Sequence, residues 1–212
     1  MITNEISISN CTLRILSTIR GLVSESKDVE SEIENFSPDT IALGISPGEL
    51  EDLSNWDGEP FDISSMQEIH GLFLQELVGT DRVRLPPPSF VTSIEISNKQ
   101  KIKTESLDMD EEDFTEAFNK ISAWHQLKYS RLHQKLRKGG LEAITPESFI
   151  TELDEKICTI SGYANLEKSK EIHMSKRLRN LCVNNSKVLA IIDFPRVPGI
   201  LRWFHLLKKA LE

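Results

Sequence analysis

The residues best placed to do chemistry in this sequence follow an apolar run near its end. VLAIID spans 188–193 and ends in Asp193, and Arg196 comes three residues later. A carboxylate at the end of a buried strand needs a partner or water, because burial of an unpaired charge is unfavourable. Arg196 is therefore expected either to pair with Asp193, the two capping the last helix, or to hold a small anion.

A run of acidic residues in the middle of the chain is the second candidate. Carboxylates supply the hard oxygen ligands that Mg²⁺ and Ca²⁺ prefer, but the run lacks EF-hand spacing. Acids in the first turn of a helix are also stabilised by the helix dipole. The pattern favours a solvated helix start over a metal site, and its residues are Asp108, Asp110, Glu111, Glu112 and Asp113.

Motifs for transition metals, nucleophiles and nucleotides are absent from the sequence. Its histidines form no HxH, HExxH or HxxxH pair. Cys11 stands at the start of a predicted helix, where the pKa of a thiol can be lowered, but no base accompanies it. There is no GxSxG, P-loop or GxGxxG motif. We therefore predict no catalytic residue, no metal ligand and no cofactor.

The charge of the chain argues against a nucleic-acid-binding protein. Lys and Arg number 25 against 33 Asp and Glu, which gives a formal net charge of -8. Nucleic-acid binders usually carry a basic surface instead. One basic cluster could bind RNA, but cations near a helix C-terminus are favoured by the dipole alone. Its members are Lys128, Arg131, Lys135, Arg137 and Lys138.

The cysteines and the N-terminal segment predict a cytoplasmic protein. Cys11, Cys158 and Cys182 are far apart and odd in number, as expected of reduced thiols. The first residues lack the basic and apolar regions of a signal peptide. No run reaches the roughly 18 apolar residues of a membrane-spanning helix.

Apolar runs that alternate with helical patterns predict a layered α/β fold. We expect an open, mostly parallel sheet flanked by helices, with a helix-rich insertion before the last strand. The chain is interpreted as one domain over 1–212, with a possible helical subdomain over about 112–185. The expected strands are 5–9, 40–45, 102–107 and 188–193, and the expected helices include 12–24, 64–78, 111–136, 146–160, 164–183 and 198–211.

In open α/β sheets, ligands bind outside the carboxyl ends of the strands. Ser46 follows the second expected strand, and Pro47 and Glu49 behind it mark a capped helix start. The same rule selects residues after the other three strands. The predicted ligand-binding residues are Asn10, Cys11, Ser46, Asp108, Asp193 and Arg196.

Two stretches of the chain resemble a known family. ISISNCTLRIL…FSPDTIALGISPGELEDL and EIHMSKRLRNL…SKVLAIIDFPRVPGI are similar to the opening and closing motifs of the TraB/PrgY pheromone-shutdown family, which is related to the Tiki metalloproteases. The resemblance covers 5–55 and 165–203. It implies two glycine-x-x-histidine motifs, after the first strand and directly before VPGI, and a glutamate that ends the second strand. In the family, these residues form the proposed metal-binding and catalytic set.

This chain departs from the family at each of those positions. The resemblance puts the first motif around Ser7–Asn10, with Asn10 or Cys11 in place of histidine, and Gly44 in place of the glutamate. Arg196 takes the second histidine position. A guanidinium has no lone pair to give a metal and is always charged.

These departures predict a non-catalytic, TraB-like protein that binds a partner or a small anionic ligand. The alternative is a metal-dependent hydrolase with a rebuilt carboxylate site, in which Asp193 and Asp108 or Asp110 would hold a hard metal. The last helix is more apolar than one buried stripe requires, which predicts a homodimer through Trp203, Phe204 and Leu207. No membrane span is expected.

Overall fold

The computed structural model describes residues 2–8, 10–58, 65–139 and 141–209, and describes their side chains except at 65–69 and 207–209. Strands in this part form one five-stranded sheet in the order β1-β2-β5-β3-β4. β1 is antiparallel to β2, and the other neighbours are parallel. The predicted mostly parallel α/β fold is confirmed. The strands are β1 (Ile2–Ile8), β2 (Cys11–Thr18), β3 (Thr40–Leu43), β4 (Lys103–Ser106) and β5 (Lys187–Asp193).

β2 corrects the prediction of a helix over 12–24. Ile8 pairs with Cys11, so β1 and β2 form a tight hairpin, and the chain runs on as a strand beside β5. Leu13 and Ile15 pack on one face of the sheet and Leu16 on the other. A strand buried on both faces shows no clean alternation, and a short apolar run then fits helical spacing equally well.

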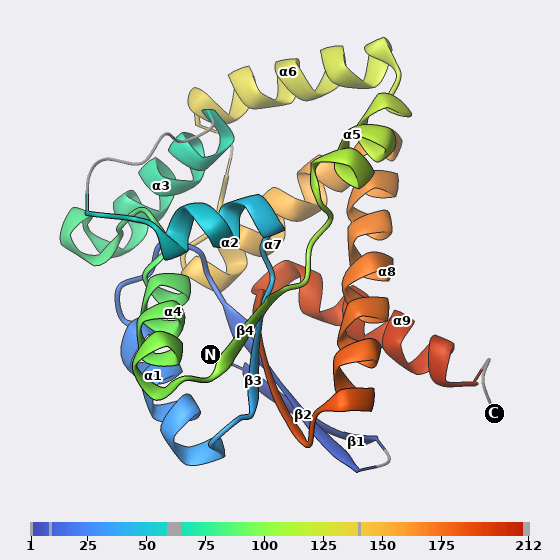
Figure 1. Ribbon diagram of the computed structural model, residues 1–212. Coiled ribbons are helices and arrows are strands. Elements are labelled where there is room, and N and C mark those ends of the chain that lie inside the picture. The colour runs from blue at the N-terminus through green and yellow to red at the C-terminus, as the bar shows by residue number, and fades with distance from the viewer. Residues whose placement is uncertain (1, 9, 59–64, 140, 210–212) are drawn as a thin grey trace.

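Helices cover both faces of the sheet (Figure 1). α1 (Glu25–Phe36), α2 (Pro47–Ser54) and α4 (Pro88–Gln100) pack on one face, where Phe36, Leu53 and Phe90 are buried against β3 and β5. α8 (Ser161–Asn184) and α9 (Val197–Lys209) pack on the other face through Met174 and Phe204. The sheet is therefore the middle of three layers.

A third group of helices caps one end of the sheet. α3 (Ser65–Val78), α6 (Ala123–Arg137) and α7 (Pro146–Cys158) share a core in which Leu74, Leu136 and Phe149 are buried. Ile19, directly after β2, belongs to the same core, so the cap lies over the carboxyl ends of the parallel strands. Figure 1 shows α3 and α6 beyond that end of the sheet.

The helix-rich insertion before β5 does not stand apart from the rest. α8 packs on the sheet, whereas α6 and α7 belong to the cap. The helix predicted over 111–136 is divided into α5 (Glu111–Asn119) and α6, because Ser122 caps α6 by accepting a 3.3 Å hydrogen bond from the amide of His125. Two short 3₁₀ helices, η1 (Thr80–Arg82) and η2 (Phe194–Arg196), complete the described elements.

Two further expectations concern the whole chain. In the described ranges, no helix is both long enough and apolar enough to cross a membrane. Cys11, Cys158 and Cys182 are free thiols, and Cys11 and Cys182 are buried.

Candidate functional site

A cavity of about 310 Å³ lies where the carboxyl ends of the parallel strands meet the cap. Arg20 follows β2, Gly44 follows β3, Asp108 follows β4 and Asp193 ends β5, and all four line the cavity. α7 and α8 form the opposite wall. The cavity therefore occupies the place where open α/β sheets bind their ligands. Its further charged or polar lining residues are Thr18, Glu49, His70, Asp154, Glu167, Lys170 and Arg196.

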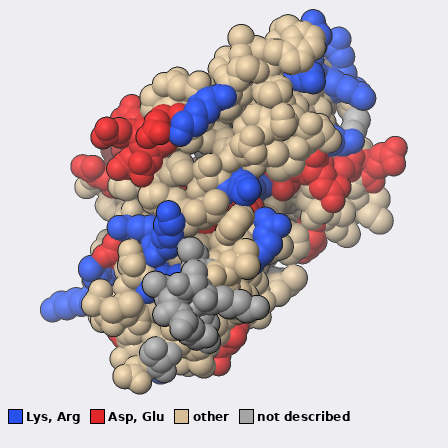
Figure 2. Space-filling view, turned by 90° about the vertical axis from the view of Figure 1, so that its right-hand side faces the viewer, with Lys and Arg blue, Asp and Glu red and all other residues tan. Residues whose placement is uncertain are grey.

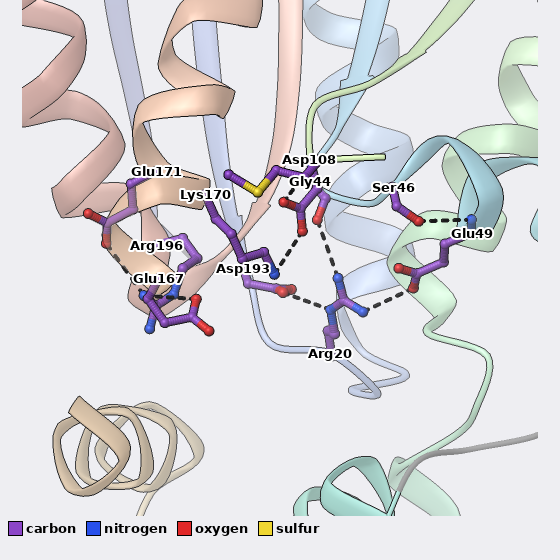
Figure 3. A network of polar contacts seen from close by, with 11 residues as sticks. Arg20, Gly44, Ser46, Glu49, Asp108, Glu167, Lys170, Glu171, Asp193 and Arg196 are labelled. Carbon is purple, nitrogen blue, oxygen red and sulfur yellow. Dashed lines mark hydrogen bonds and ion pairs between the residues drawn. The ribbon is translucent and has the colours of Figure 1, made fainter. Parts of the chain in front are cut away.

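Arg20 links three elements at this edge of the sheet. Its Nε lies 2.7 Å from Asp193 Oδ2, one terminal nitrogen lies 3.0 Å from Glu49 Oε1, and the other donates to the Gly44 carbonyl at 3.3 Å. Figure 3 shows the guanidinium between these partners. Burial alone would lower the pKa of Arg20, but the carboxylates of Asp193 and Glu49 outweigh it and raise the pKa. The side chain is thus a fixed cation.

Lys170 on α8 and Asp108 form a second pair across the cavity. Lys170 Nζ lies 2.8 Å from Asp108 Oδ2, and Asp108 Oδ1 accepts the backbone N–H of Met109 at 2.8 Å. Burial alone would lower the pKa of Lys170, yet Glu167 and Asp108 raise it. Because this pair joins α8 to the end of β4, it fixes one wall of the cavity (Figure 3).

Arg196, at the end of η2, is buried among three carboxylates. It pairs with Asp154 of α7, with Glu167 at 3.2 Å and with Glu171 at 3.4 Å. Burial lowers its pKa to about 10, so the guanidinium stays charged at neutral pH. The expected pair between Asp193 and Arg196 is wrong, since Asp193 pairs with Arg20 instead.

Burial weakens the acidity of the carboxylates around the two arginines. It raises the pKa of Glu49, although Arg20 opposes the shift, and it raises the pKa of Glu167 against the pull of Lys170. The pKa of Glu171 is raised for the same reason. In each of these groups burial outweighs the neighbouring cations, so the pKa lies above its usual value.

Two buried polar atoms at the cavity have no hydrogen-bond partner in the protein. They are Asp193 Oδ1 and His70 Nε2. Burial lowers the pKa of His70 to about 4, against the attraction of Asp193, so its imidazole is neutral at pH 7. His70 also hydrogen-bonds the backbone of Arg20, which leaves Nε2 as the free ring nitrogen. Unpaired buried polar atoms are uncommon and often mark a binding site.

The structure brings three of the six predicted site residues together. Asp108, Asp193 and Arg196 line the cavity. Ser46 stands just outside it and accepts the Glu49 amide at 3.1 Å, which caps α2 and positions Glu49 at Arg20. Asn10 lies in the turn before β2 and Cys11 begins β2, so both are at the amino end of this strand, away from the cavity.

Cys11 does not lie at the start of a helix, where the sequence analysis placed it. It lies in a strand, and burial raises its pKa. The acidic run behaves as expected after Asp108: Asp110 caps α5 by accepting the Asp113 amide at 2.9 Å, and Glu111 and Glu112 are exposed. A solvated helix start is confirmed for these residues.

Sequence reasoning missed Arg20, His70, Glu167 and Lys170. Arg20 fell within the wrongly predicted helix over 12–24. Glu167, Lys170, Glu171 and Met174 recur at helical spacing, on the stripe of α8 that faces the core. Charged residues on such a stripe are a signal that could have been used, because a buried charge needs a partner.

Exposed charges gather elsewhere on the molecule. The face shown in Figure 2 carries acidic side chains over α5 at one upper corner and basic side chains over α6 at the other. Lys128 and Arg131 lie over the ring of Trp124, 5.5 and 5.9 Å from its centroid. Of the same basic cluster, Lys135 and Arg137 lie in the last turn of α6, where the helix dipole favours cations.

In the part of the chain that is described, no three His, Cys, Asp or Glu side chains come together as a metal site would require. No protein-family model and no curated protein matches this sequence. The resemblance to the TraB/PrgY family therefore stays a prediction.

Proposed function

We propose that this chain is a non-catalytic, TraB-like protein that binds a small polar molecule in the cavity at the carboxyl edge of its sheet. The observation that carries the proposal is the presence of two arginines, Arg20 and Arg196, directly after β2 and β5. Both are held by carboxylates. A guanidinium can donate hydrogen bonds but cannot ligate a metal.

The strand order supports this comparison with the family. Since β2 is the first parallel strand, a glycine-x-x-histidine motif after it would fall at Ser17–Arg20 rather than at Ser7–Asn10. The second motif would fall at Asp193–Arg196. Both histidine positions are then arginines, and both line one cavity.

Gly44, at the position of the family's glutamate, adds to the same argument. Its carbonyl accepts a hydrogen bond from Arg20. A Cβ built on Gly44 would meet the Ile192 Cα at 3.3 Å, so the backbone passes close to β5 and leaves little room for a longer side chain. The position supplies a backbone acceptor instead of a carboxylate.

Nuclear magnetic resonance of the ¹⁵N-labelled chain tests the ligand-binding function. We expect some members of a library of small polar compounds to shift the amide signals of Arg20, Asp108 and Asp193. Signals of Asn10, before β2, and of Val183, near the C-terminal end of α8, lie outside the cavity, serve as the control and should not move. A library that leaves the cavity amides unchanged would overturn the proposal.

A metal-dependent hydrolase is the second candidate, and one observation favours it. Asp108 and Asp193 line the same cavity, together with Glu49 and Glu167. Each is also paired with a cation, which a metal would have to displace. Zn²⁺ or Mn²⁺ offered to the purified chain should be lost on desalting. One equivalent retained by the wild type and lost in Asp108→Asn would favour the hydrolase.

The small anion expected at Arg196 gains no support from its contacts. Three carboxylates surround the guanidinium, so an anion would have to displace at least one of them. A cytoplasmic location stays a prediction from the cysteines and the N-terminal segment.

We propose self-association through α9 only in a changed form. Phe204 is 1% exposed and belongs to the core, so it cannot form a dimer contact, and the side chain of Leu207 lies outside the described residues. Trp203 is half-buried, and Leu206 is 50% exposed. Light scattering at high concentration should show a dimer that Leu206→Glu weakens. A wild type that stays monomeric would end this proposal.

A further inference from the structure

The charges that line the cavity do not balance. Among the described residues, three cationic side chains line it: Arg20, Lys170 and Arg196. Five carboxylates line it as well, namely Glu49, Asp108, Asp154, Glu167 and Asp193. His70 is neutral and contributes no charge at pH 7. The described lining therefore holds two more carboxylates than cations.

Each of the three cations is already occupied. Arg20 has Asp193 and Glu49, Lys170 has Asp108, and Arg196 has Asp154, Glu167 and Glu171. An anionic ligand would have to break one of these pairs and leave a carboxylate uncompensated, which is costly in a buried site. The excess of carboxylates over cations instead favours a cationic ligand.

The two unpaired buried atoms point to the same kind of ligand. Asp193 Oδ1 can only accept hydrogen bonds while the carboxylate is ionised. His70 uses one ring nitrogen on the backbone of Arg20, and a bond that raises the pKa is one in which the imidazole donates. Nε2 of the neutral ring is then an acceptor. Both atoms call for a donor group on the ligand.

The remaining wall is apolar and belongs to the cap and α8. Ile150, Leu153 and Ile157 come from α7, and Met174 comes from α8. A volume of about 310 Å³ is at the small end of ligand pockets. An aliphatic chain of a few carbons can therefore lie on the apolar wall while a charged end reaches the strand ends.

We propose that the cavity binds a small aliphatic amine in its protonated form, with the ammonium donating to Asp193 Oδ1 and the carbon chain packed against α7. The inference rests on the ligand-binding function proposed above and adds the chemical class of the ligand. Protonated amines have donors only, which matches a site that offers acceptors.

Calorimetry on the full chain with three compounds of equal carbon number tests the ligand class. Cadaverine, pentanediol and glutarate share a five-carbon chain and differ in charge. We expect cadaverine to bind with one molecule per chain, more weakly at high salt, and the other two to give no measurable binding. Asp193→Asn should weaken cadaverine binding roughly tenfold or more, as the loss of a charge-assisted hydrogen bond implies.

Two further variants distinguish a loss of ligand binding from a loss of folding. Glu49→Gln also removes a lining carboxylate and should weaken cadaverine binding, even if Asp193→Asn unfolds the chain. Asp52→Asn removes an exposed carboxylate of α2 outside the cavity and should bind cadaverine like the wild type. Cadaverine binding that neither Asp193→Asn nor Glu49→Gln weakens would overturn the proposal.

The outcomes separate this inference from the function on which it rests. Glutarate or pentanediol binding that Glu49→Gln alters would overturn the amine ligand but leave a ligand-binding cavity. No binding of the three probes, combined with cavity amides that shift with other compounds, would do the same. If no compound shifts the amide signals of the cavity residues, both the amine ligand and the ligand-binding function are overturned.

Discussion

Among the residues that the structure describes, Arg196 pairs with three carboxylates, more than Arg20 or Arg14 does. The whole residue is 8% exposed, and its guanidinium faces carboxylates from α7 and α8. Removing one partner of a buried ion pair is worse than removing both, because the remaining charge keeps the cost of desolvation without its compensation.

We expect Arg196→Met to lower the free energy of unfolding by about 3 kcal/mol or more, since three carboxylates lose their common partner. Urea denaturation near pH 7 measures the loss. Arg202→Met is the matched control: Arg202 lies 3.9 Å from Glu171 but its side chain is 63% exposed. Exposed pairs contribute at most about 1 kcal/mol, so equal losses in both variants would contradict this interpretation.

His70 gives the molecule a dependence on pH whose sign can be stated. Its pKa is about 4 in the folded chain because burial disfavours the charged ring, and about 6.5 in an unfolded chain. The stabilising contribution is complete above pH 6.5 and is lost as the pH falls toward 4. The full difference amounts to about 3 kcal/mol.

His70→Phe should remove that component of the pH dependence. The side chain sits edge-on to Phe149, with ring centroids 5.7 Å apart, so an aromatic replacement suits the site. Between pH 7 and pH 4, the wild type should lose about 3 kcal/mol more stability than His70→Phe, because only the wild type has this titrating ring. Parallel curves would show that His70 does not titrate as buried.

The sequence allowed some of the site residues to be predicted, but not their pairing. Asp108, Asp193 and Arg196 follow strands and were accessible to the rule for open sheets. Their partners come from segments far away in the chain, such as Arg20 and Lys170. Which cation meets which carboxylate depends on strand order, and a single sequence does not show that order.

At the scale of elements, α2 and α7 both begin with a polar N-cap side chain, but only the cap of α2 also positions a partner of Arg20. Ser46 caps α2 next to the cavity, and Thr145 caps α7 with a reciprocal contact to Ser148. Both start signals were predicted from the sequence, because a polar cap followed by proline is a local pattern.

Ser46→Ala and Thr145→Ala should each reduce stability by about 1 kcal/mol, the usual loss of an N-cap. Only Ser46→Ala should also move the Arg20 Nε–H resonance, because α2 carries Glu49 to Arg20. Thermal unfolding and NMR spectra of the two variants measure both effects. An Arg20 signal that moves equally in both would contradict the role of α2.

The elements themselves were predictable where their pattern is unambiguous. β5 is buried on both faces along Val188–Ile192, and its apolar run identified it as a strand. The same reasoning did not identify β2 as a strand, because Thr, Arg and Ser separate its apolar residues at a spacing that also fits a helix. Its identity as a strand comes from pairing with β1 and β5, which are non-local contacts.

For the whole molecule, the order of the strands predicts which backbone amides are most strongly protected from hydrogen exchange. β5 is central, pairs with β2 and β3, and is buried at every residue from Val188 to Ile192. α6 of the cap has one buried residue, Leu136, among those described. We expect β5 amides to exchange with deuterium only through global unfolding and α6 amides to exchange orders of magnitude faster. Similar rates in both would contradict a sheet-centred core.

The position of β5 also has a consequence for the route by which the chain folds. It is the last strand in sequence among those described, yet it lies between β2 and β3, which do not pair with each other. Until residues 187–193 insert, the two halves of the sheet lack their common neighbour and Arg20 lacks Asp193. During synthesis, the described sheet therefore cannot be completed until β5 has been made, and the cavity forms in the same step that completes the sheet.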